Sequence, residues 1–278
     1  MICAQCGFAL EQVDGIWRGI RAERRPGVNA FLDDYTRIRL AEGRGSDDPA
    51  FYLNLPNPTA GDPLAWQWTM RAATWSHVVR RVLPGSGGPL RVVDVGAGVG
   101  WMSHRLRALG HDPIAIDLSV DGRDGLGAAR HYCETWARVQ AEFDALPLAA
   151  GQADLVVYNA SFHYSTDYEV TLLEARRVLR PGGHVLILDT PVYRHPESGA
   201  MMVAERHSRF EERFGVRSDS VPSIEYLTHS KLAELENRLG FRWQCSEAWY
   251  GWRWRLRPFR ARLRGKREPS RFITLLGS

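Results

Sequence analysis

Long apolar runs, cysteine and lysine are all scarce in this chain of 278 residues. No apolar run approaches the roughly 20 residues that a membrane-spanning helix needs, so no such helix is predicted. No basic segment followed by an apolar stretch opens the chain, which argues against a signal peptide. The 4 cysteines are too few for a disulfide framework. These absences predict a reduced, cytoplasmic protein with no membrane partner.

Positive charge is carried almost entirely by arginine. The formal net charge is +4, and Lys231 and Lys266 are the only two lysines. Such usage is typical of coding bias, so net charge alone does not predict a nucleic-acid partner. The stretch 250–269 stands apart, because seven arginines and one lysine alternate there with aromatic residues such as Trp252 and Phe259. It predicts either a solvated basic excursion or a surface that stacks bases and neutralises phosphates.

Residues 1–60 show no regular pattern. Cys3 and Cys6 near the start resemble half of a zinc ribbon. Zinc takes four ligands, and the other cysteines, Cys133 and Cys245, lie far along the chain. No metal site is therefore predicted, and the pair is interpreted as a turn within an N-terminal extension.

Regular patterns begin near residue 61. The stretch 43–63 is rich in glycine, proline and short polar residues and predicts a loop or linker. An acid followed by proline at 62–63 is typical of a helix start, and the apolar spacing continues to about Leu83. Strands and helices then alternate as far as Leu188, which predicts a parallel sheet covered on both faces. We therefore expect a main domain over 61–278.

The most informative stretch is Val92-Val93-Asp94-Val95-Gly96-Ala97-Gly98-Val99-Gly100. A strand-like segment enters a loop with glycine at every second position, and 101–109 has helical composition closed by Gly110. Glycine lets a backbone approach a ligand, and a helix start offers free N–H groups. Asp117 ends the next predicted strand about 20 residues on, where an acid faces a ribose. This order predicts a cofactor site.

The glycine spacing separates two cofactor families. The dinucleotide fingerprint is G-x-G-x-x-G, whereas this loop reads G-x-G-x-G after the acid Asp94. It resembles the first motif of the class I S-adenosylmethionine-dependent methyltransferases. Three later stretches are similar to that family's adenine-side motif, fourth strand and fifth-strand region, in the expected order: 143–148, 153–158 and 177–188. The resemblance covers about 90–188.

The resemblance implies an α/β, Rossmann-like fold. Its sheet would be mostly parallel and seven-stranded, with an antiparallel C-terminal hairpin formed by 241–249 and 271–276. The cofactor would be S-adenosyl-L-methionine, leaving S-adenosyl-L-homocysteine as product. Asp117 would bind both ribose hydroxyls, and Asp144 would accept the exocyclic amine of adenine. The cofactor contacts implied by the resemblance are Asp94, Gly96, Ala97, Gly98, Gly100, Asp117, Leu118, Asp144, Ala145 and Asn159.

The end of the fourth strand would face the transferable methyl group. It reads Asn159-Ala160-Ser161-Phe162-His163-Tyr164 and lacks the two prolines that nucleobase amino-methyltransferases often carry there, which disfavours nucleobase N-methylation. His163 is the candidate general base, because a histidine pKa lies near neutral, and Asn159 is the second catalytic candidate. Simple packing beside the cofactor is the alternative for His163.

The predicted reaction is methyl transfer to a small-molecule acceptor, of the kind found in secondary metabolism. The insertion 191–226 is expected to close as a lid over an apolar acceptor through Met201, Met202 and Phe210 on an amphipathic helix. Three alternatives stay open: an RNA methyltransferase using the basic stretch, a nicotinamide oxidoreductase, and a cofactor-binding interaction subunit. The acceptor atom and the oligomeric state do not follow from the sequence.

Overall fold

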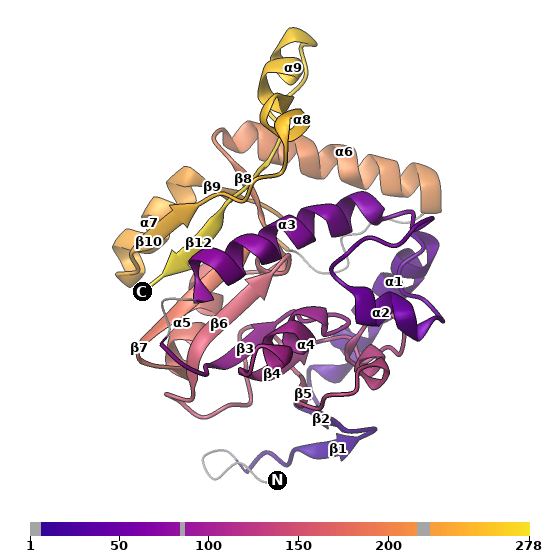
Figure 1. The fold of residues 1–278 in the computed structure, drawn as a ribbon, viewed down its shortest axis with the longest axis vertical. Helices are drawn as coiled ribbons and strands as arrows, with labels where there is room; N and C mark the ends of the chain where they lie inside the picture. The colour runs from indigo at the N-terminus through magenta and orange to yellow at the C-terminus, as the bar shows by residue number, and fades with distance from the viewer. Residues whose placement is uncertain (1–6, 84–86, 216–222) are drawn as a thin grey trace.

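The computed structural model describes residues 7–83, 87–215 and 223–278 (Figure 1). Its centre is a nine-stranded sheet with the order β1-β2-β5-β4-β3-β6-β7-β12-β10. Parallel pairing joins β5, β4, β3, β6 and β7, whereas β12 and β10 are antiparallel. The bounds of these seven strands are Ala137–Gln140, Asp112–Asp117, Arg91–Val95, Ala153–Asn159, Leu179–Leu188, Thr274–Gly277 and Trp243–Ser246. They confirm the predicted fold.

Helices cover both faces of this sheet. Val92 of β3 packs into one apolar cluster with the helices α2, α3 and α4, and Val93 packs into the opposite cluster with α5 and α7. This division follows from the alternation of side chains along a strand, and strands buried on both faces are nearly continuous in apolar residues. The bounds of these helices are Pro49–Asn54, Ala65–Arg81, Trp101–Ala108, Tyr168–Val178 and His229–Leu239.

Local capping explains where several helices begin and end. The Asp167 carboxylate accepts the N–H of Glu169 at the start of α5, and the Thr228 hydroxyl accepts the N–H of Lys231 at the start of α7. Gly240, with φ of 69°, ends α7. Capping uses only neighbours in the chain, so these helix ends depend on local sequence.

The expectation that 1–60 lacks regular structure is wrong for its described part. β1 (Glu11–Val13) and β2 (Ile16–Arg18) form a hairpin that extends the sheet through β5. The helix α1 (Arg25–Ala41) follows, and α2 lies inside the predicted linker 43–63. Strands of three residues are too short to show a period, and α1 buries only Val28 and Ile38. Cys3 and Cys6 lie outside the described residues.

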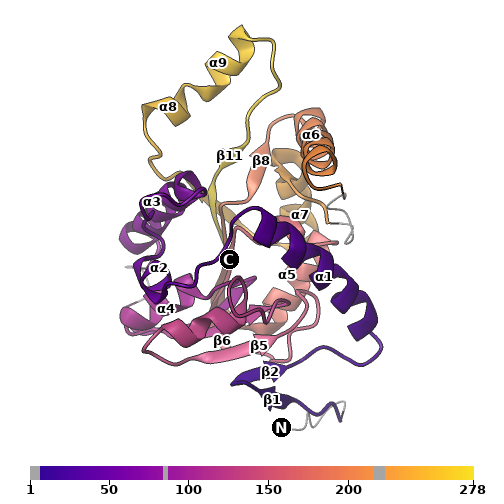
Figure 2. The same cartoon turned by 90° about the vertical axis from the view of Figure 1, so that its right-hand side faces the viewer.

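The C-terminal part adds a second, three-stranded sheet with the order β11-β8-β9. The amphipathic helix predicted within 191–226 is confirmed as α6. Beyond the body of the molecule, α8 and α9 stand out as an arm in both views (Figures 1 and 2). The elements of this part are β8 (Pro191–Tyr193), α6 (Pro196–Phe214), β9 (Leu227–Thr228), α8 (Trp252–Arg255), α9 (Arg257–Leu263) and β11 (Arg271–Phe272).

Two 3₁₀ helices, Leu126–His131 and Phe162–Tyr164, lie in loops at the carboxyl side of the sheet. Within the described ranges, no helix combines the length and the apolarity that crossing a bilayer requires. The cytoplasmic location stays a prediction.

Candidate cofactor site

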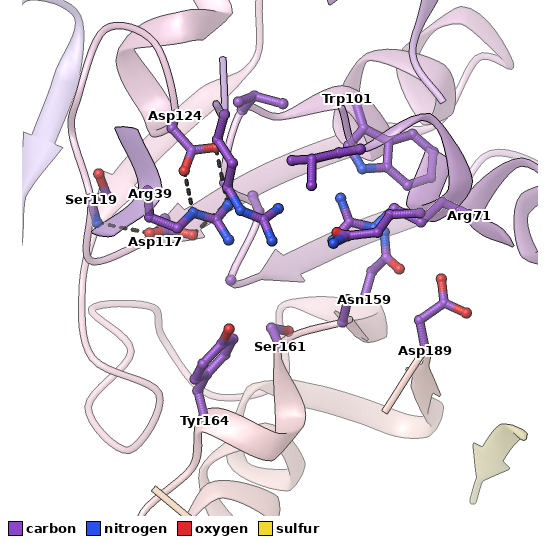
Figure 3. A pocket seen from close by; sticks show the side chains of 18 of the residues that line it. Arg39, Arg71, Trp101, Asp117, Ser119, Asp124, Asn159, Ser161, Tyr164 and Asp189 are labelled. Carbon is purple, nitrogen blue, oxygen red and sulfur yellow. Dashed lines mark hydrogen bonds and ion pairs between the residues drawn. The ribbon is translucent and has the colours of Figure 1, made fainter. Parts of the chain in front are cut away.

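A cavity of about 320 Å³ lies at the carboxyl ends of β3, β4, β6 and β7. We call it the central cavity. The glycine loop after β3 forms its floor, and residues of α1 and α3 cover it. Figure 3 shows two polar groups of side chains in it: Asp117 with its neighbours on one side, and Asn159 with Arg71 and Asp189 on the other. A site at strand ends beneath covering helices suits a small ligand.

A second cavity of about 410 Å³ lies beneath α1, and we call it the α1 cavity. Its walls come from α1, from the loop after β5, from the first turns of α5 and from α6. The two cavities adjoin, because they share seven lining residues: Phe31, Tyr35, Arg39, Arg44, Leu118, Phe143 and Tyr164. A ligand in the central cavity therefore lies next to a second space of comparable size.

The glycine loop is built for close approach of a ligand. Gly96 and Gly98 have φ of 73° and 54°, in the left-handed region that favours glycine. A Cβ on Gly96 would lie 2.3 Å from the Cβ of Ser161, whereas a Cβ on Gly98 would meet no atom within 4 Å. The open flank at Gly98 is therefore the part of the loop that a ligand can occupy. Ala97 lines the same cavity, but Gly100 caps α4 and does not line it.

Two buried oxygens beside this loop have no hydrogen-bond partner among the residues that the structure describes. They are Oδ1 of Asp94 and Oδ1 of Asn159, and both residues line the central cavity. The other Asp94 oxygen accepts the Ser103 hydroxyl at 2.8 Å, and burial raises the pKa of Asp94 to about 7. Burying acceptors without donors is costly, so both oxygens fit a ligand that brings N–H or O–H groups. The ammonium group of S-adenosylmethionine is such a donor.

Asp117 ends β4, as predicted, and faces the central cavity. Its oxygens accept the backbone N–H groups of Gly98 at 2.8 Å and Ser119 at 2.7 Å, so this carboxylate also holds the glycine loop in place. The sequence did not reveal this second task. Beside it, Arg39 of α1 forms an ion pair with Asp124 (Figure 3). That pair ties α1 to the loop after β4.

The two residues predicted on the adenine side, Asp144 and Ala145, have less support from the structure. Asp144 and Ala145 are exposed, and neither lines the central cavity, although Asp144 lines the α1 cavity. Phe143 precedes them and lines both cavities, as does Leu118. Phe143 and Leu118 therefore lie where the two cavities adjoin.

Arg71 is a site residue that the sequence reading missed. It extends from α3 into the central cavity, beside Asn159 in Figure 3, with its guanidinium 4.7 Å from the ring centre of Trp68. It forms neither a hydrogen bond nor an ion pair with any described residue, and burial lowers its pKa to about 10. The charge of Asp189 compensates this cation in part, and its unused N–H donors fit an anionic group of a ligand. No local motif marks such a residue.

Asp189 follows β7 in a left-handed backbone conformation, with φ of 49°. It is buried, accepts the Thr74 hydroxyl at 2.6 Å and lies near the Tyr250 hydroxyl at 3.4 Å. Burial raises its pKa to about 6. An acid directly after a buried strand was the available signal for this residue, at the same sheet edge as Asp117.

His163 lines the central cavity, as the prediction requires. Burial, together with the positive charges of Arg206 and Arg71, lowers its pKa to about 3. The ring is then neutral at ordinary pH and has little affinity for a proton, which favours hydrogen bonding over proton abstraction. Its catalytic role, like that of Asn159, stays a prediction. No cluster of His, Cys, Asp or Glu suited to a metal ion occurs in the described parts of the chain.

Comparison with known proteins agrees with a cofactor site at this edge of the sheet. Residues 93–187 match the family model described as a methyltransferase domain. A malonyl-[acyl-carrier protein] O-methyltransferase of Hahella chejuensis is 29% identical over 171 residues, which cover 59% of this chain and 55% of that protein. The enzyme of the same name from Erwinia pyrifoliae is 38% identical over 100 residues, covering 36% of this chain and 37% of that one. The chain thus spans about half or less of these relatives.

Two solved structures share the fold. An S-adenosylmethionine-dependent methyltransferase from Mesorhizobium loti has a TM-score of 0.53 at 21% identity, covering 74% of this chain and 97% of that one. The 1,6-didemethyltoxoflavin-N1-methyltransferase of Burkholderia thailandensis, solved with its acceptor and S-adenosylhomocysteine, has a TM-score of 0.53 at 17% identity. It covers 100% of this chain and 96% of its own. Both structures show the same fold as this chain. The match of residues 93–187 to a methyltransferase domain agrees with the predicted family and with S-adenosylmethionine as its cofactor.

Proposed function

We propose that this chain, a class I S-adenosylmethionine-dependent methyltransferase by family and fold, transfers a methyl group to a small, largely apolar acceptor. The observation that carries the proposal is the direct junction of the two cavities. One holds the glycine loop and the buried acceptor oxygens. The other is lined by apolar side chains, among them Val28, Ile38 and Phe210, together with charged side chains such as Glu142 and Arg206. A transferase needs this arrangement, because donor and acceptor must meet in one closed space.

The cofactor would lie along the carboxyl edge of the sheet. Its methionine part would rest on the open flank of Gly98, with the ammonium group donating to Asp94 and Asn159. Its ribose would meet Asp117, and its adenine would lie between Leu118 and Phe143. When bound, it supplies a methyl group already activated by the positive sulfur.

The remaining task of the protein is to hold the acceptor and to exclude water. In-line displacement requires the acceptor atom about 3–3.5 Å from the methyl carbon. The α1 cavity would hold the apolar body of the acceptor, and the neutral His163 ring would orient its polar end by a hydrogen bond. The helices α1 and α3 cover the site, and the segment 191–226 borders it through Pro191 and Phe210. We assign that segment the role of a lid.

Arg71 favours a carboxylate as the methylated group. Its guanidinium, unpaired with any described residue, faces the central cavity and suits a carboxylate in its fixed fork geometry. The relatives reported above are named as O-methyltransferases of a malonyl group. These names mention no RNA, and the structural neighbour from Burkholderia thailandensis was solved with a small-molecule acceptor, 1,6-didemethyltoxoflavin. We therefore do not propose an RNA acceptor.

The proposal is tested with methyl-labelled S-adenosylmethionine and a panel of aliphatic and aromatic carboxylic acids, phenols and amines. We expect label in an apolar acid. The variant Phe210→Ala should raise the KM for that acceptor without changing cofactor affinity, because Phe210 lines only the α1 cavity. The expected acceptor contacts Met201 and Met202 line neither cavity, so that part of the lid prediction is wrong. Met201→Ala is therefore the matched control, since Met201 lies on the same helix and is 51% exposed. Binding of NADH in place of S-adenosylmethionine would contradict the proposal.

A further inference from the structure

The segment 249–267 leaves the body of the molecule, folds into the short helices α8 and α9, and returns to β11. We call it the arm. It stands clear of the body in Figures 1 and 2. Its base is attached by Trp254, whose ring lies 5.2 Å from that of Phe272 and 3.1 Å from the guanidinium carbon of Arg257. Farther along, Arg267 forms an ion pair with Glu205 of α6 at 2.8 Å. The arm is thus held at its two ends and free along its length.

A stripe of large apolar side chains runs along the arm and faces solvent. Trp252 is 69% exposed, Leu256 50%, Phe259 62% and Leu263 71%. Phe259 and Leu263 are four residues apart and lie on one side of α9, whereas Trp252 begins α8 and Leu256 joins the two helices. In a globular protein such a stripe ordinarily packs on the core, and large exposed apolar patches mark interaction sites.

The charge of the arm is of one sign. It holds seven arginines and one lysine and no acidic residue, although the formal net charge of the whole chain is only +4. The rest of the chain is therefore net negative, and the positive charge is concentrated in the arm. Seven of its eight cations form no ion pair with any residue that the structure describes; Arg267 is paired with Glu205, and Arg257 donates to the carbonyl oxygen of Ser270.

We propose that the arm binds the surface of an anionic phospholipid bilayer. The stripe would enter the boundary between headgroups and acyl chains, and the arginines would meet the lipid phosphates. An apolar stripe of Trp, Phe and Leu beside a basic face is the composition of helices that lie in this boundary. Trp252 and Phe259 also suit base stacking, so binding of a nucleic acid is the competing outcome of the test, whereas the shared positive charge disfavours pairing with the arm of a second copy.

The base of the arm is continuous with the central cavity. A hydrogen bond of 2.8 Å joins the hydroxyl groups of Tyr250 and Thr74, and Tyr250 also contacts Asp189 and Phe272, which both line that cavity. A bound bilayer would therefore lie on the side of the molecule where the cavity meets the arm. The sequence prediction of no membrane partner rested on the lack of spanning runs, which does not bear on surface binding.

The test is co-sedimentation of the full chain with vesicles of phosphatidylcholine alone and with vesicles containing phosphatidylserine. We expect binding to the anionic vesicles only, weakened by salt. Arg260→Glu combined with Arg264→Glu should abolish it, since each cation near such a surface contributes about fivefold to the partition coefficient. Trp252→Ser combined with Leu263→Ser should also abolish it at low salt, because the apolar stripe is lost.

Matched controls separate the arm from general charge and general hydrophobicity. Arg80→Glu combined with Arg81→Glu makes the same charge change on α3, and Leu173→Ser removes an apolar side chain that is 45% exposed on α5. Both should bind vesicles as the parent does, apart from the small loss due to net charge. Circular dichroism and cofactor affinity verify that every variant is folded. No sedimentation with anionic vesicles, equal binding by the arm variants, or retention on polyuridylate instead of lipid would overturn the proposal.

Discussion

The two cavities are made in different ways. On its glycine-loop side, the central cavity takes its polar groups from short neighbouring segments, because Asp94, Gly98 and Asp117 lie within 24 residues of one another. Its opposite side depends on Arg71 of α3 and on Asp189. The α1 cavity takes its walls from segments far apart, since Val28 and Phe210 are 182 residues apart in the chain. The glycine-loop part of the cofactor site is thus built from segments close together in the sequence. The acceptor part is built from segments far apart in the chain.

A substitution at Gly98 should have the largest effect, because the added side chain occupies the space where the cofactor would contact the glycine loop. Gly98→Ala adds a Cβ on the open flank of the loop at φ of 54°. We expect affinity for S-adenosylmethionine, measured by calorimetry, to fall about 100-fold from the lost close approach and from strain of about 1–2 kcal/mol.

Gly110→Ala is the matched control, because Gly110 also has positive φ, of 85°, and also has no atom near its Cβ position, but it lies outside both cavities. It should lose stability and keep affinity. If Gly98→Ala binds the cofactor as the parent does, the loop is not the cradle, and the local half of the comparison fails.

Substitution of Arg71 tests whether this residue belongs to the cofactor half or to the acceptor half of the site. Arg71→Met removes a cation that forms no hydrogen bond or ion pair with a described residue but whose charge acts on the buried Asp189, so we expect a small loss of thermal stability. Loss of a charge-assisted hydrogen bond should weaken binding of its partner about tenfold. If cofactor affinity falls, Arg71 serves the cofactor half; if only the KM of a carboxylate acceptor rises, it serves the acceptor half. Arg80→Met, an exposed change on the same helix, is the control. Unchanged binding of both would remove Arg71 from the site.

The smallest expected effect is on the pH dependence of thermal stability, through Asp94 in the cofactor half of the site. Burial raises the pKa of Asp94 from its ordinary value of 3.8 to about 7, so the folded protein binds a proton there that the unfolded chain releases above about pH 4. The stabilisation is complete below about pH 4 and is lost as pH rises towards 7. Asp94→Asn should flatten the fall of Tm across this range and raise Tm at pH 8 by roughly 3 °C.

Scanning fluorimetry of the protein without cofactor measures this effect. Asp189, whose pKa is raised in the same direction, contributes its own slope and remains in both proteins, so the difference between parent and variant isolates Asp94. An identical pH dependence of the two proteins would contradict a raised pKa at Asp94. The same substitution should weaken binding of the cofactor, because it removes the carboxylate to which the ammonium group would donate.

The sequence by itself determined the β3–loop–α4 unit and the acid Asp117. Each depends on neighbours in the chain: glycine permits positive φ, a capping oxygen reaches two or three residues, and parallel strands bring their carboxyl ends to one edge. Family resemblance added the order of the later strands. These features could be read because the physical forces that make them act over a few residues.

Only the tertiary structure decided the rest. The helix α1 carries Val28, Phe31, Tyr35 and Ile38 at helical spacing, so the helix itself could have been predicted. Its position over the two cavities is set by tertiary packing. Arg71 was missed because a buried guanidinium has no local signature, and its environment comes from α3 packing over strand ends. The arm was read as a basic stretch, but its exposed apolar stripe becomes visible only where no other element covers it. Burial depends on contacts between distant segments, and the sequence does not state which of them meet.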